Sequence, residues 1–538
     1  MKFSQLTIVA LVLIGCESYI EKPGPRYVAT KGEPWPKPQT QIKNDAYFVL
    51  RPQFFEFQVK NNAKCTLLHD AVLRYQSIIS GLYESVDENL KFVSHQHHKK
   101  EWLSDNNFIG HLESAVVNLS GSCDDNDYPS QDMKENYSIN ITPDNAEIQS
   151  STIWGILRGL ETFSQLIYIA DDYVSLRINT TSISDYPRFA HRGLLLDTSR
   201  HFIPVKKMLE NLDAMAYNKL NVFHWHIVDD QSFPYVSRKY PELSEQGAYK
   251  PSQVYTPAVM QQIVEYARVR GIRVIPEFDT PGHTRSWGVA HPEVLTACGG
   301  NLAGEYGPMD PSKVETYNLL AGLLGEVSET FPDQYIHLGG DEVDFDCWES
   351  NANISKFMKK ENITDYKGLE SYFVQRVINI VDALKAKSIV WEEVFENGVK
   401  LPTETIVQVW KGPWEQTMSE VTLSGKTAIL SSCWYLDHLD SYGDWQKFYN
   451  CEPYNFTGVD SQKKLVLGGE ACMWAEVVNE FNVISRVWPR ASAAAEKLWS
   501  AENVTDIKEA TLRLEEHVCR MNRRGVGAQP PSGPGFCP

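Results

Sequence analysis

The chain has 538 residues, which is too long for one small domain and suits a large catalytic domain with a smaller companion. Its contents of 42% hydrophobic and 22% charged residues are typical of a globular protein with a sizeable core. The formal charge of −18, from 69 acidic against 51 basic residues, repels phosphate backbones, and no basic stripe interrupts it, so we expect no nucleic-acid partner.

Residues 1–18 have the form of a signal peptide. Lys2 precedes an apolar run over 6–14 that is too short to span a bilayer, and small residues follow. The segment around Cys16 also resembles a bacterial lipoprotein box, in which Cys16 would be acylated. Asn-X-Ser/Thr sequons favour the eukaryotic secretory route instead, and they predict glycosylation at Asn118, Asn136, Asn140, Asn179, Asn353, Asn362, Asn455 and Asn503. We therefore expect a secreted or lysosomal protein without a membrane span.

The cysteines predict a disulfide-bonded protein. Loss of Cys16 with the signal segment would leave an odd number, most of which should pair in an oxidising compartment. Neighbours along the chain favour the pairs Cys65 with Cys123, Cys298 with Cys347, and Cys519 with Cys537. Cys433 with Cys451 is a weaker pairing, and Cys472 would then be a buried free thiol in an apolar strand.

The first domain is predicted to be small and supporting. Residues 19–40 are rich in proline and lysine, which predicts an extended leader or linker. Over 41–184, strand-like runs such as 114–119 and 137–141 alternate with helical runs at 67–80 and 153–169, which indicates an α/β domain with few candidate catalytic residues. The sequence DYPR at 185–188 breaks this pattern and begins a second domain, expected over 185–538.

The second domain is predicted to be a (β/α)8 TIM barrel. Short apolar runs occur at 193–197, 222–229, 273–278, 335–340, 389–392, 405–409, 427–432 and 465–469. Helical stretches with apolar residues at i, i+3 and i+4 separate most of them, at 205–217, 258–270, 314–329 and 369–384. Apolar strands that alternate with helices predict a parallel sheet covered by helices, and eight such units predict a closed barrel. We expect a long loop before the eighth run and a final helix at 507–523.

Carboxylates and tryptophans recur where these runs end, and this end of a barrel is the one that carries chemistry. A core requires neither at such frequency. Flat aromatic side chains bind the apolar faces of a pyranose and carboxylates accept its hydroxyls, so a neutral sugar fits better than a phosphate. The strand-end residues include Asp197, Arg200, Asp229, Glu277, Asp279, His283, Asp341, Glu342, Trp391, Glu392, Trp410, Tyr435, Asp437, Glu470, Trp474 and Glu476.

Glu342 is the candidate proton donor for glycoside hydrolysis, because Gly339 and Gly340 before it allow close backbone approach at the barrel mouth. Asp341 precedes it, and neighbouring residues on a strand point to opposite faces. This pair should therefore not flank one bond as acid and nucleophile about 5 Å apart. Either Glu392 or Glu476 supplies the nucleophile from another strand, or the substrate supplies its own.

The segment HLGGDEV at 337–343 resembles the signature of glycoside hydrolase family 20. The segments around it are similar to the lysosomal β-hexosaminidase subunits of animals, of the beta type in particular. They are HRG at 191–193, DTSRH at 197–201, NVFHWHIVDD at 221–230, PEFDTPGH at 276–283, GEACMW at 469–474 and WPRA at 488–491. The likeness covers nearly the whole chain after the signal segment.

The resemblance implies an exo-acting β-N-acetylhexosaminidase that cleaves terminal N-acetylglucosamine or N-acetylgalactosamine with retention. The acetamido oxygen of the substrate would attack the anomeric carbon and form an oxazolinium ion, so neither cofactor nor metal is implied. Glu342 would protonate the leaving oxygen and then activate water, Asp341 would orient the acetamido group, and Tyr435 would bind its carbonyl. The resemblance places Trp391, Trp410 and Trp474 around the sugar, Arg200 and Glu476 at its distal hydroxyls, Asp437 near its 6-hydroxyl, and Asp229, His283 and Asp279 in a supporting network.

The resemblance also bears on specificity and partners. Asp437 matches the subunit type that prefers neutral sugars, whereas the other type has Asn-Arg there to receive a 6-sulfate. His438 departs from both patterns and is a candidate cation at acid pH, which leaves sulfated sugars open as substrates. The expected partners are an amino-sugar glycoconjugate, a second subunit in a homo- or heterodimer, and a lipid-presenting activator protein.

Two other protein classes remain as alternatives. His224 and His226 share one strand face, as the metal ligands of an amidohydrolase do, but such a site also needs histidines where Trp391 and Trp410 stand. Hydrogen-bonded histidines inside the barrel explain the pair better. A catalytically inactive carbohydrate-binding protein would be expected to lose Glu342 or Tyr435, and both are present.

Overall fold

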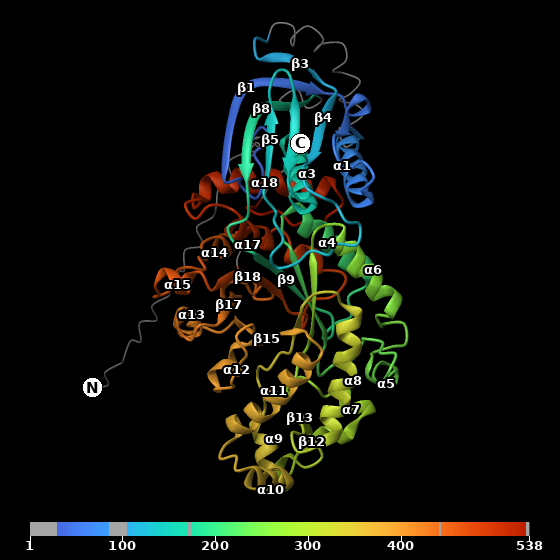
Figure 1. Ribbon diagram of the computed structural model, residues 1–538, viewed down its shortest axis with the longest axis vertical. Coiled ribbons are helices and arrows are strands. Elements are labelled where there is room, and N and C mark those ends of the chain that lie inside the picture. Colours follow the sequence, from blue (N-terminus) through green and yellow to red (C-terminus); the bar gives the residue numbers. More distant parts are fainter. Residues whose placement is uncertain (1–29, 85–104, 171–174, 441–442, 534–536, 538) are drawn as a thin grey trace, which may run out of the picture.

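The structure is a computed structural model that describes residues 30–84, 105–170, 175–440, 443–533 and 537. The predicted signal peptide over 1–18, with Cys16, lies outside the described residues. The described chain forms a sheet domain and a barrel domain that are stacked along the long axis of the molecule (Figure 1).

The N-terminal domain is an open sheet with two long helices packed against it. Its strands pair in the order β2-β4-β6-β5-β8-β1-β3, with β7 on β8. They are β1 (Thr40–Leu50), β2 (Glu56–Val59), β3 (Phe108–Leu112), β4 (Ser114–Leu119), β5 (Tyr137–Ile141), β6 (Ala146–Ser150), β7 (Tyr168–Ile169) and β8 (Leu176–Asp185). The 3-10 turn η1 (Pro52–Phe54) lies between β1 and β2.

The helices of this domain, α1 (Thr66–Glu84) and α3 (Ile153–Leu166), share an apolar core with the sheet. Every residue of α3 is buried, because the helix also contacts the barrel, where Arg158 donates to the carbonyls of Arg270 and Gly271. The predicted helix over 153–169 is wrong at its end. Tyr168 pairs with Arg177 as part of β7, so the sheet overrides the helical pattern there.

The barrel domain is a closed ring of parallel strands, and the predicted (β/α)8 fold is confirmed. Among the described residues the ring runs β9-β10-β11-β14-β15-β16-β17-β18. The strands are β9 (His191–Asp197), β10 (Val222–Val228), β11 (Arg273–Phe278), β14 (Tyr335–His337), β15 (Lys387–Trp391), β16 (Ile406–Val409), β17 (Thr427–Leu430) and β18 (Val466–Met473). Its longer outer helices are α4 (Val205–Tyr217), α6 (Pro257–Arg268), α8 (Val314–Thr330), α11 (Tyr366–Ala383), α13 (Trp414–Leu423) and α17 (Arg490–Trp499).

Shorter elements fill the loops of the barrel. They are α5 (Glu242–Gly247), α7 (Trp287–Ala290), η4 (Pro292–Val294), β12 (Leu295–Ala297), η5 (Gly300–Leu302), β13 (Tyr306–Met309), α9 (Phe345–Ser350), α10 (Ala352–Glu361), α12 (Glu392–Glu396) and α16 (Val483–Val487). Between β17 and β18 the chain forms η6 (Ser432–Trp434), α14 (Trp445–Tyr449) and α15 (Asp460–Lys463) rather than one regular helix. The final helix α18 (Ile507–Arg523) has the predicted bounds.

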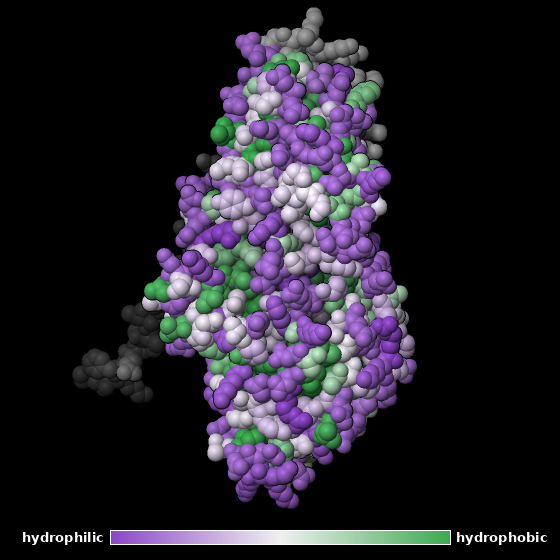
Figure 2. Space-filling model, viewed as in Figure 1, coloured by the Kyte–Doolittle hydropathy of each residue, from purple (hydrophilic) through white to green (hydrophobic). Residues whose placement is uncertain are grey.

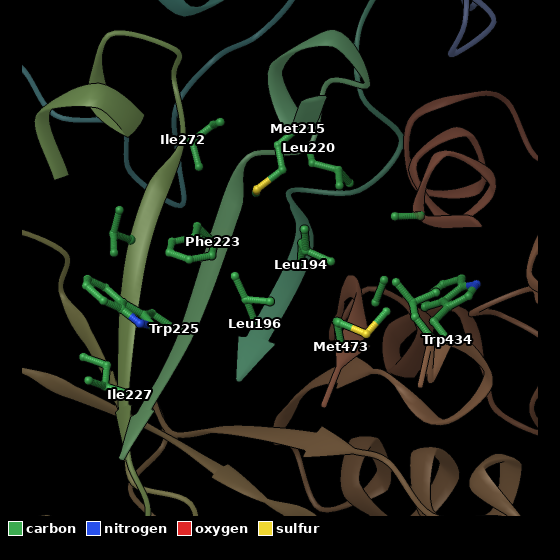
Figure 3. Packing of buried hydrophobic residues seen from close by; sticks show 14 of the residues in the cluster. Leu194, Leu196, Met215, Leu220, Phe223, Trp225, Ile227, Ile272, Trp434 and Met473 are labelled. Carbon is green, nitrogen blue, oxygen red and sulfur yellow. The ribbon is translucent and has the colours of Figure 1, made fainter. Parts of the chain in front are cut away.

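Side chains alternate along the barrel strands between the helices and the interior. On β10, Phe223, Trp225 and Ile227 pack outward with Leu194 and Leu196 of β9 (Figure 3). An inward apolar cluster consists of Val222, Ile275, Tyr335, Ile389, Ile406 and Ile429. A second inward cluster, which includes Trp391 and Trp474, lies where the strands end. Histidines and carboxylates occupy inward positions between the two clusters and lead toward the mouth.

Residues 30–39 are bound to the barrel domain, so the interpretation of 19–40 as a linker is wrong for this part. Trp35 is fully buried, and its indole donates to the carbonyl of Ser492 over 2.9 Å. The backbone N–H of Thr30 donates to Glu516 on α18 over 2.7 Å. The burial of Trp35 therefore fixes this proline-rich segment on the barrel domain, although its composition predicts a free, extended linker.

The disulfides join the three expected pairs and the weaker fourth one. These pairs are Cys65 with Cys123, Cys298 with Cys347, Cys433 with Cys451, and Cys519 with Cys537. Cys472 is a buried free thiol, as its apolar strand indicated. Each of these disulfides links segments within one domain, so the covalent links stabilise the two domains separately.

On the face in Figure 2, hydrophilic side chains predominate and apolar ones lie among them. Within the described ranges, no helix has both the length and the apolar content that a membrane crossing requires.

Candidate active site

The candidate acid pair, Asp341 and Glu342, lies in the loop after β14 rather than on the strand. β14 ends at His337, and φ is positive at Gly339 (67°), Gly340 (99°) and Glu342 (50°). The left-handed conformation at Glu342 is uncommon for a residue with a Cβ atom. The expectation that strand alternation turns the two carboxyls to opposite faces is therefore wrong, because the strand has already ended.

The glycines of this loop are required by space as well as by φ. A Cβ atom on Gly339 would come within 1.7 Å of the Oδ1 atom of Asp279. One on Gly340 would come within 2.3 Å of the side chain of Val394. A larger residue at either position would push the acid pair away from the barrel, which explains the Gly-Gly that precedes it.

Both carboxyls of the pair face the imidazole of His283, in the loop after β11. The Nε2 atom of His283 lies 3.7 Å from Asp341 Oδ2 and 3.6 Å from Glu342 Oε2, and its Nδ1 atom lies 3.2 Å from Asp229 Oδ1. Burial alone would lower the pKa of His283, but the charges of Asp341 and Asp229 outweigh it and raise this pKa well above its ordinary value. His283 is therefore a cation that holds several carboxylates together.

Asp279 lies buried behind the acid pair and keeps its proton. Burial raises the pKa of Asp279, and the charge of Asp341 raises it further. Its Oδ1 atom accepts a hydrogen bond from the N–H of Gly340 over 2.8 Å. The protonated carboxyl of Asp279 thus donates to Asp341 while it fixes the backbone of the loop.

The guanidinium of Arg200, after β9, lies among three carboxylates. Its nitrogens are 3.0 Å from Asp197, 2.8 Å from Asp229 and 3.7 Å from Glu476. Burial lowers the pKa of Arg200, but these carboxylates raise it further than burial lowers it. The group also lies 5.1 Å from the centre of the Trp474 ring. Because Glu476 is 56% exposed, this cluster presents charged hydrogen-bonding groups to solvent at the rim.

An aromatic and apolar cluster lines the centre of the mouth. Its members are Leu195, Trp391, Trp410, Tyr435, Cys472 and Trp474. The ring centres of Trp391 and Trp474 are 6.1 Å apart, and those of Trp410 and Tyr435 are 5.9 Å apart in a stacked arrangement. The predicted tryptophans therefore come together from different strands to form apolar walls of the kind that bind sugar rings.

Tyr435 and Asp437 follow β17 and offer a donor and an acceptor. Burial raises the pKa of Tyr435 well above its ordinary value, with Cys472 adding to the effect, so the phenol keeps its proton. The Oδ1 atom of Asp437 is buried and has no hydrogen-bond partner among the described residues. His438 lies 3.5 Å from the other oxygen of Asp437 and is 73% exposed. The free acceptor suits a hydroxyl group of a bound ligand.

A cavity of about 200 Å³ opens beside the acid pair. Its lining includes Glu342, His283, Asp230 and Arg285. The side chain of Glu342 is 61% exposed, in contrast to its buried neighbour Asp341. Glu342 therefore reaches a solvent-open space, as a residue that exchanges protons with a bound molecule must.

The two histidines of β10 belong to a carboxylate network inside the barrel. His224 lies 2.6 Å from Glu470, and His226 lies 2.6 Å from Glu277 and 2.8 Å from Asp229. Burial lowers their pKa values, but the carboxylates outweigh it and raise the pKa of His224 to about 9 and that of His226 to about 10. Each of the two histidines is therefore held by carboxylates inside the barrel, in accord with their interpretation as hydrogen-bonded interior residues.

Sequence reasoning gave no role to two strand-end carboxylates that hold the tryptophans. The indole N–H of Trp391 donates to Glu277 over 2.8 Å, and that of Trp410 donates to Glu393 over 2.9 Å. Burial raises the pKa of Glu393 to about 7, with Asp341 adding to it. The available signal was an acidic residue at a strand end near a tryptophan, but the sequence does not tell which indole meets which carboxylate.

Glu392, one of the alternative nucleophiles, is fully buried and accepts a hydrogen bond from the backbone N–H of Lys411 over 2.9 Å. Burial raises the pKa of Glu392 to about 7. Glu476, the other alternative, lies at the rim beside Arg200. A buried, backbone-bound carboxyl cannot attack a substrate, so Glu392 is unsuited to that role.

Comparison with known proteins gives consistent matches along the chain. Residues 189–502 match the catalytic domain of glycosyl hydrolase family 20, and residues 34–166 match a domain described as beta-acetyl hexosaminidase like. The chain is 46% identical to human beta-hexosaminidase subunit beta, over 98% of this chain and 93% of the human protein. It is 45% identical to rat beta-hexosaminidase subunit alpha, over 94% of each chain. The structure of a Flavobacterium johnsoniae chitobiase, 32% identical, matches with a TM-score of 0.76 over 91% of this chain and 73% of that one.

Proposed function

Since the chain belongs to glycosyl hydrolase family 20, we propose that Glu342 is the proton donor of its reaction and that Asp341 assists the acetamido group of the substrate. The protein is an exo-acting β-N-acetylhexosaminidase, which removes terminal N-acetylglucosamine or N-acetylgalactosamine with retention by a substrate-assisted mechanism. The observation that carries the residue assignment is the convergence of both carboxyls on His283 at the barrel mouth.

The reaction begins with attack by the substrate's acetamido oxygen on the anomeric carbon. Glu342 gives its proton to the glycosidic oxygen as that bond breaks, and an oxazolinium ion forms. Glu342 then takes a proton from a water molecule, which attacks the same carbon and reopens the ring, so that two inversions give net retention. An intramolecular nucleophile of this kind corresponds to an effective molarity of about 10⁵–10⁸ M.

Asp341 and Tyr435 act at the two polar ends of the acetamido group. Asp341, which Asp279 holds by a hydrogen bond, accepts the acetamido N–H and stabilises the positive charge that develops on the ring. Tyr435 keeps its phenolic proton because burial raises its pKa, so it donates to the acetamido oxygen. Together they aim the nucleophilic oxygen at the anomeric carbon.

The rest of the site binds the sugar and ends the pocket. Trp391, Trp410 and Trp474 pack on the acetamido group and on the apolar face of the pyranose. Arg200 and Glu476 bind distal hydroxyls, which leaves no room for a further sugar on the non-reducing side. Asp437 accepts the 6-hydroxyl, so neutral sugars are preferred, and the imidazole of His438 lies beside this carboxylate at 3.5 Å.

Replacing Glu342 with Gln tests the proton donor. The amide keeps the size of the side chain but delivers no proton, so kcat on an alkyl N-acetylglucosaminide should fall by about 10²–10⁴-fold. With a dinitrophenyl leaving group, which needs no protonation, kcat/KM should lose little because it reports the first step, whereas kcat should stay low because Glu342 also activates the water of the second step. The melting temperature should change little, because Glu342 is 61% exposed.

The matched control for this variant is Asp365→Asn, which makes the same change from carboxylate to amide outside the cavity. Asp365 caps α11 through its side chain, and asparagine caps a helix equally well. We expect wild-type kinetics from Asp365→Asn. Normal turnover of the alkyl substrate by Glu342→Gln would contradict the assignment.

We also propose that the protein travels the secretory route to the lysosome or the cell exterior and works as a homo- or heterodimer. Disulfides support the route, and similarity to both alpha and beta subunits supports the dimer. After β18, Val477 (69% exposed) and Phe481 (87% exposed) are exposed apolar side chains that a second subunit would cover. A lipid-presenting activator protein belongs to the same proposal, because the sugar of a glycolipid must be lifted from its membrane to enter the barrel mouth.

The secretory proposal predicts where glycans occur. Asn118 and Asn179 are each 8% exposed, and their amide nitrogens donate to Glu147 over 3.0 Å and to the Asn44 carbonyl over 2.8 Å. The expectation of glycans at these two sequons therefore conflicts with the fold, because a glycan would replace one of those amide protons and needs open space. The remaining sequon residues, Asn136, Asn140, Asn353, Asn362, Asn455 and Asn503, are exposed.

Glycopeptide mapping of the secreted protein should find glycans among the exposed sequons and none at Asn118 or Asn179. The unmodified peptides with these two asparagines should account for all of the recovered signal. A glycan on either residue in folded, active protein would contradict this prediction.

A further inference from the structure

We infer that Glu277 is a positioning residue whose single buried carboxylate ties the aromatic wall of the pocket to the proton donor. This inference rests on the proposed function. Glu277 lies on β11 and is fully buried. Its Oε1 atom accepts the indole N–H of Trp391 over 2.8 Å. Its Oε2 atom lies 2.6 Å from Nδ1 of His226 and 3.0 Å from Nε2 of His224.

A continuous chain of short contacts leads from the second oxygen of Glu277 to the acid. The Nε2 atom of His226 lies 2.8 Å from Asp229 Oδ2. The other oxygen of Asp229 lies 3.2 Å from Nδ1 of His283. The Nε2 atom of His283 then lies 3.6 Å from Glu342. In each of these side chains, one polar atom contacts the neighbour on the lumen side and another contacts the neighbour on the mouth side. The position of Glu277 therefore affects the positions of the later side chains, up to Glu342.

Charge alternates along this chain, which makes each link an ion pair. The titratable groups that face Glu277 are His224 and His226 from β10, His337 from β14, Asp279 at the end of its own strand, and Cys472 from β18. Burial lowers the pKa of His337 and raises those of Asp279 and Cys472, so these three stay neutral. The cations beside Glu277 are therefore His224 and His226, with raised pKa values of about 9 and about 10.

The substrate-assisted reaction requires a link of this kind between the aromatic wall and the proton donor. Trp391 packs on the acetamido group that supplies the nucleophile, whereas Glu342 protonates the bond on the other side of the same carbon. The two must keep one relative position, and an error of about 1 Å in such an arrangement can reduce the rate about 10²-fold. A carboxylate with one oxygen on each part holds that position without touching the substrate.

The variant Glu277→Gln tests the link. Its amide keeps the volume, but its nitrogen can accept neither the indole N–H nor an N–H of His226. We expect kcat to fall about 10²-fold and KM to rise, with both values measured per folded molecule.

The matched control is Glu496→Gln. Glu496 is also fully buried, and its oxygens accept from Tyr449 over 2.8 Å and from Arg513 over 2.6 Å and 2.7 Å, but these partners lie outside the barrel mouth. Glu496→Gln should lower the melting temperature and should leave kcat and KM near wild type. Equal kinetic losses in the two variants would overturn the inference.

A double-mutant cycle with Trp391→Phe separates positioning from general destabilisation. Phenylalanine keeps an aromatic ring but removes the N–H that Glu277 accepts. If Glu277 acts through this bond, the double variant should lose little more kcat/KM than Glu277→Gln alone. Independent roles would instead give a double variant whose fold-loss in kcat/KM is the product of the two single losses. Such a product would overturn the inference.

A second cycle covers the case in which Glu277→Gln fails to fold. Trp391→Phe and His226→Gln each remove the partner of one Glu277 oxygen, so their effects should again be non-additive, and additive effects would overturn the inference.

Glu342→Gln distinguishes a failure of this inference from a failure of the proposed function. If Glu342→Gln is inactive while Glu277→Gln is normal, only the positioning role is wrong, whereas an active Glu342→Gln would refute the proton donor itself.

Discussion

The barrel lumen and the junction between the two domains both bury alternating charges, but they use different cations. In the lumen, His224 and His226 lie between the carboxylates of Glu470, Glu277 and Asp229. At the junction, the cations are arginine and lysine. The first group leads to the candidate acid, and the second holds the sheet domain on the barrel.

Glu135 is the centre of the junction. It lies in the segment before β5, and its Oε1 atom accepts from Arg158 of α3 over 2.8 Å and from Arg192 of β9 over 2.7 Å. Burial raises the pKa of Glu135, but the two arginines outweigh it and lower this pKa. Nearby, Lys219 lies 3.1 Å from Asp185. All of these side chains are buried.

The difference teaches where a protein places its titratable charge. Arginine stays protonated at any working pH, so a junction built on it holds the domains constantly. An unperturbed histidine changes charge within the physiological range, but the carboxylates of the lumen raise the pKa of His224 to about 9 and that of His226 to about 10, so both stay protonated near neutral pH. Both regions are therefore charged at neutral pH, and the cations of the lumen are the ones that alkaline pH removes.

The largest expected effect comes from breaking the junction with Glu135→Gln. Two buried arginines would lose their shared carboxylate, which typically costs about 3–5 kcal/mol in the free energy of unfolding. The kcat of the molecules that remain folded should stay at the wild-type value, because Glu135 belongs to no contact of the mouth. Chemical denaturation with kinetics on the same samples measures both. A lower kcat per folded molecule would show that the two regions are coupled.

A smaller effect is expected from pH, and it should separate the regions. The pKa values of His224 and His226 are raised to about 9 and about 10, so their stabilisation is complete below the unfolded value of about 6.5 and is lost as pH rises toward 10. The pKa of Glu135 is lowered, so its stabilisation is present above the unfolded value of about 4.3 and is lost only as pH falls further. Melting temperatures should therefore decline between pH 6.5 and pH 10.

Two variants, measured by thermal denaturation over the same pH range, sharpen the comparison of the lumen with the junction. His226→Gln should flatten the decline on the alkaline side, whereas Glu135→Gln should keep the wild-type slope at a lower melting temperature. Each pKa unit corresponds to about 1.4 kcal/mol, which makes the difference in slope measurable. Equal slopes in the two variants would mean that the lumen histidines do not titrate as their surroundings require.

The parallel strands were the most predictable part of the fold. Leu194, Leu195 and Leu196 of β9, for example, are apolar on both faces, and this pattern is typical of a strand that is covered on one side by helices and on the other by a barrel interior. β18 was predicted to end at 469 but continues to Met473. The glycines at 468 and 469 suggested that the strand ends there. Gly468 instead lies within the strand, where a Cβ atom would clash with the His191 carbonyl.

The site was predictable in its residue types and less so in its geometry. Asp341 and Glu342 stood out by their Gly-Gly context, but only the structure shows that a positive φ at Glu342 brings both carboxyls to one imidazole. The hydrogen bonds of Glu277 and Glu393 were not predictable. They depend on the relative register of strands that are more than a hundred residues apart for Glu277, and on the local turn of α12 for Glu393.

Residues 30–39 connect the beginning of the described chain to its end. The bond from Thr30 to Glu516 joins residues that are 486 positions apart, and the Lys37 N–H donates to Glu496 over 2.9 Å. A nascent chain therefore emerges from the ribosome with Trp35 lacking its binding site until α17 and α18 have been synthesised. We expect this aromatic segment to be a natural binding site for chaperones during biosynthesis, and its burial to mark the last step of maturation.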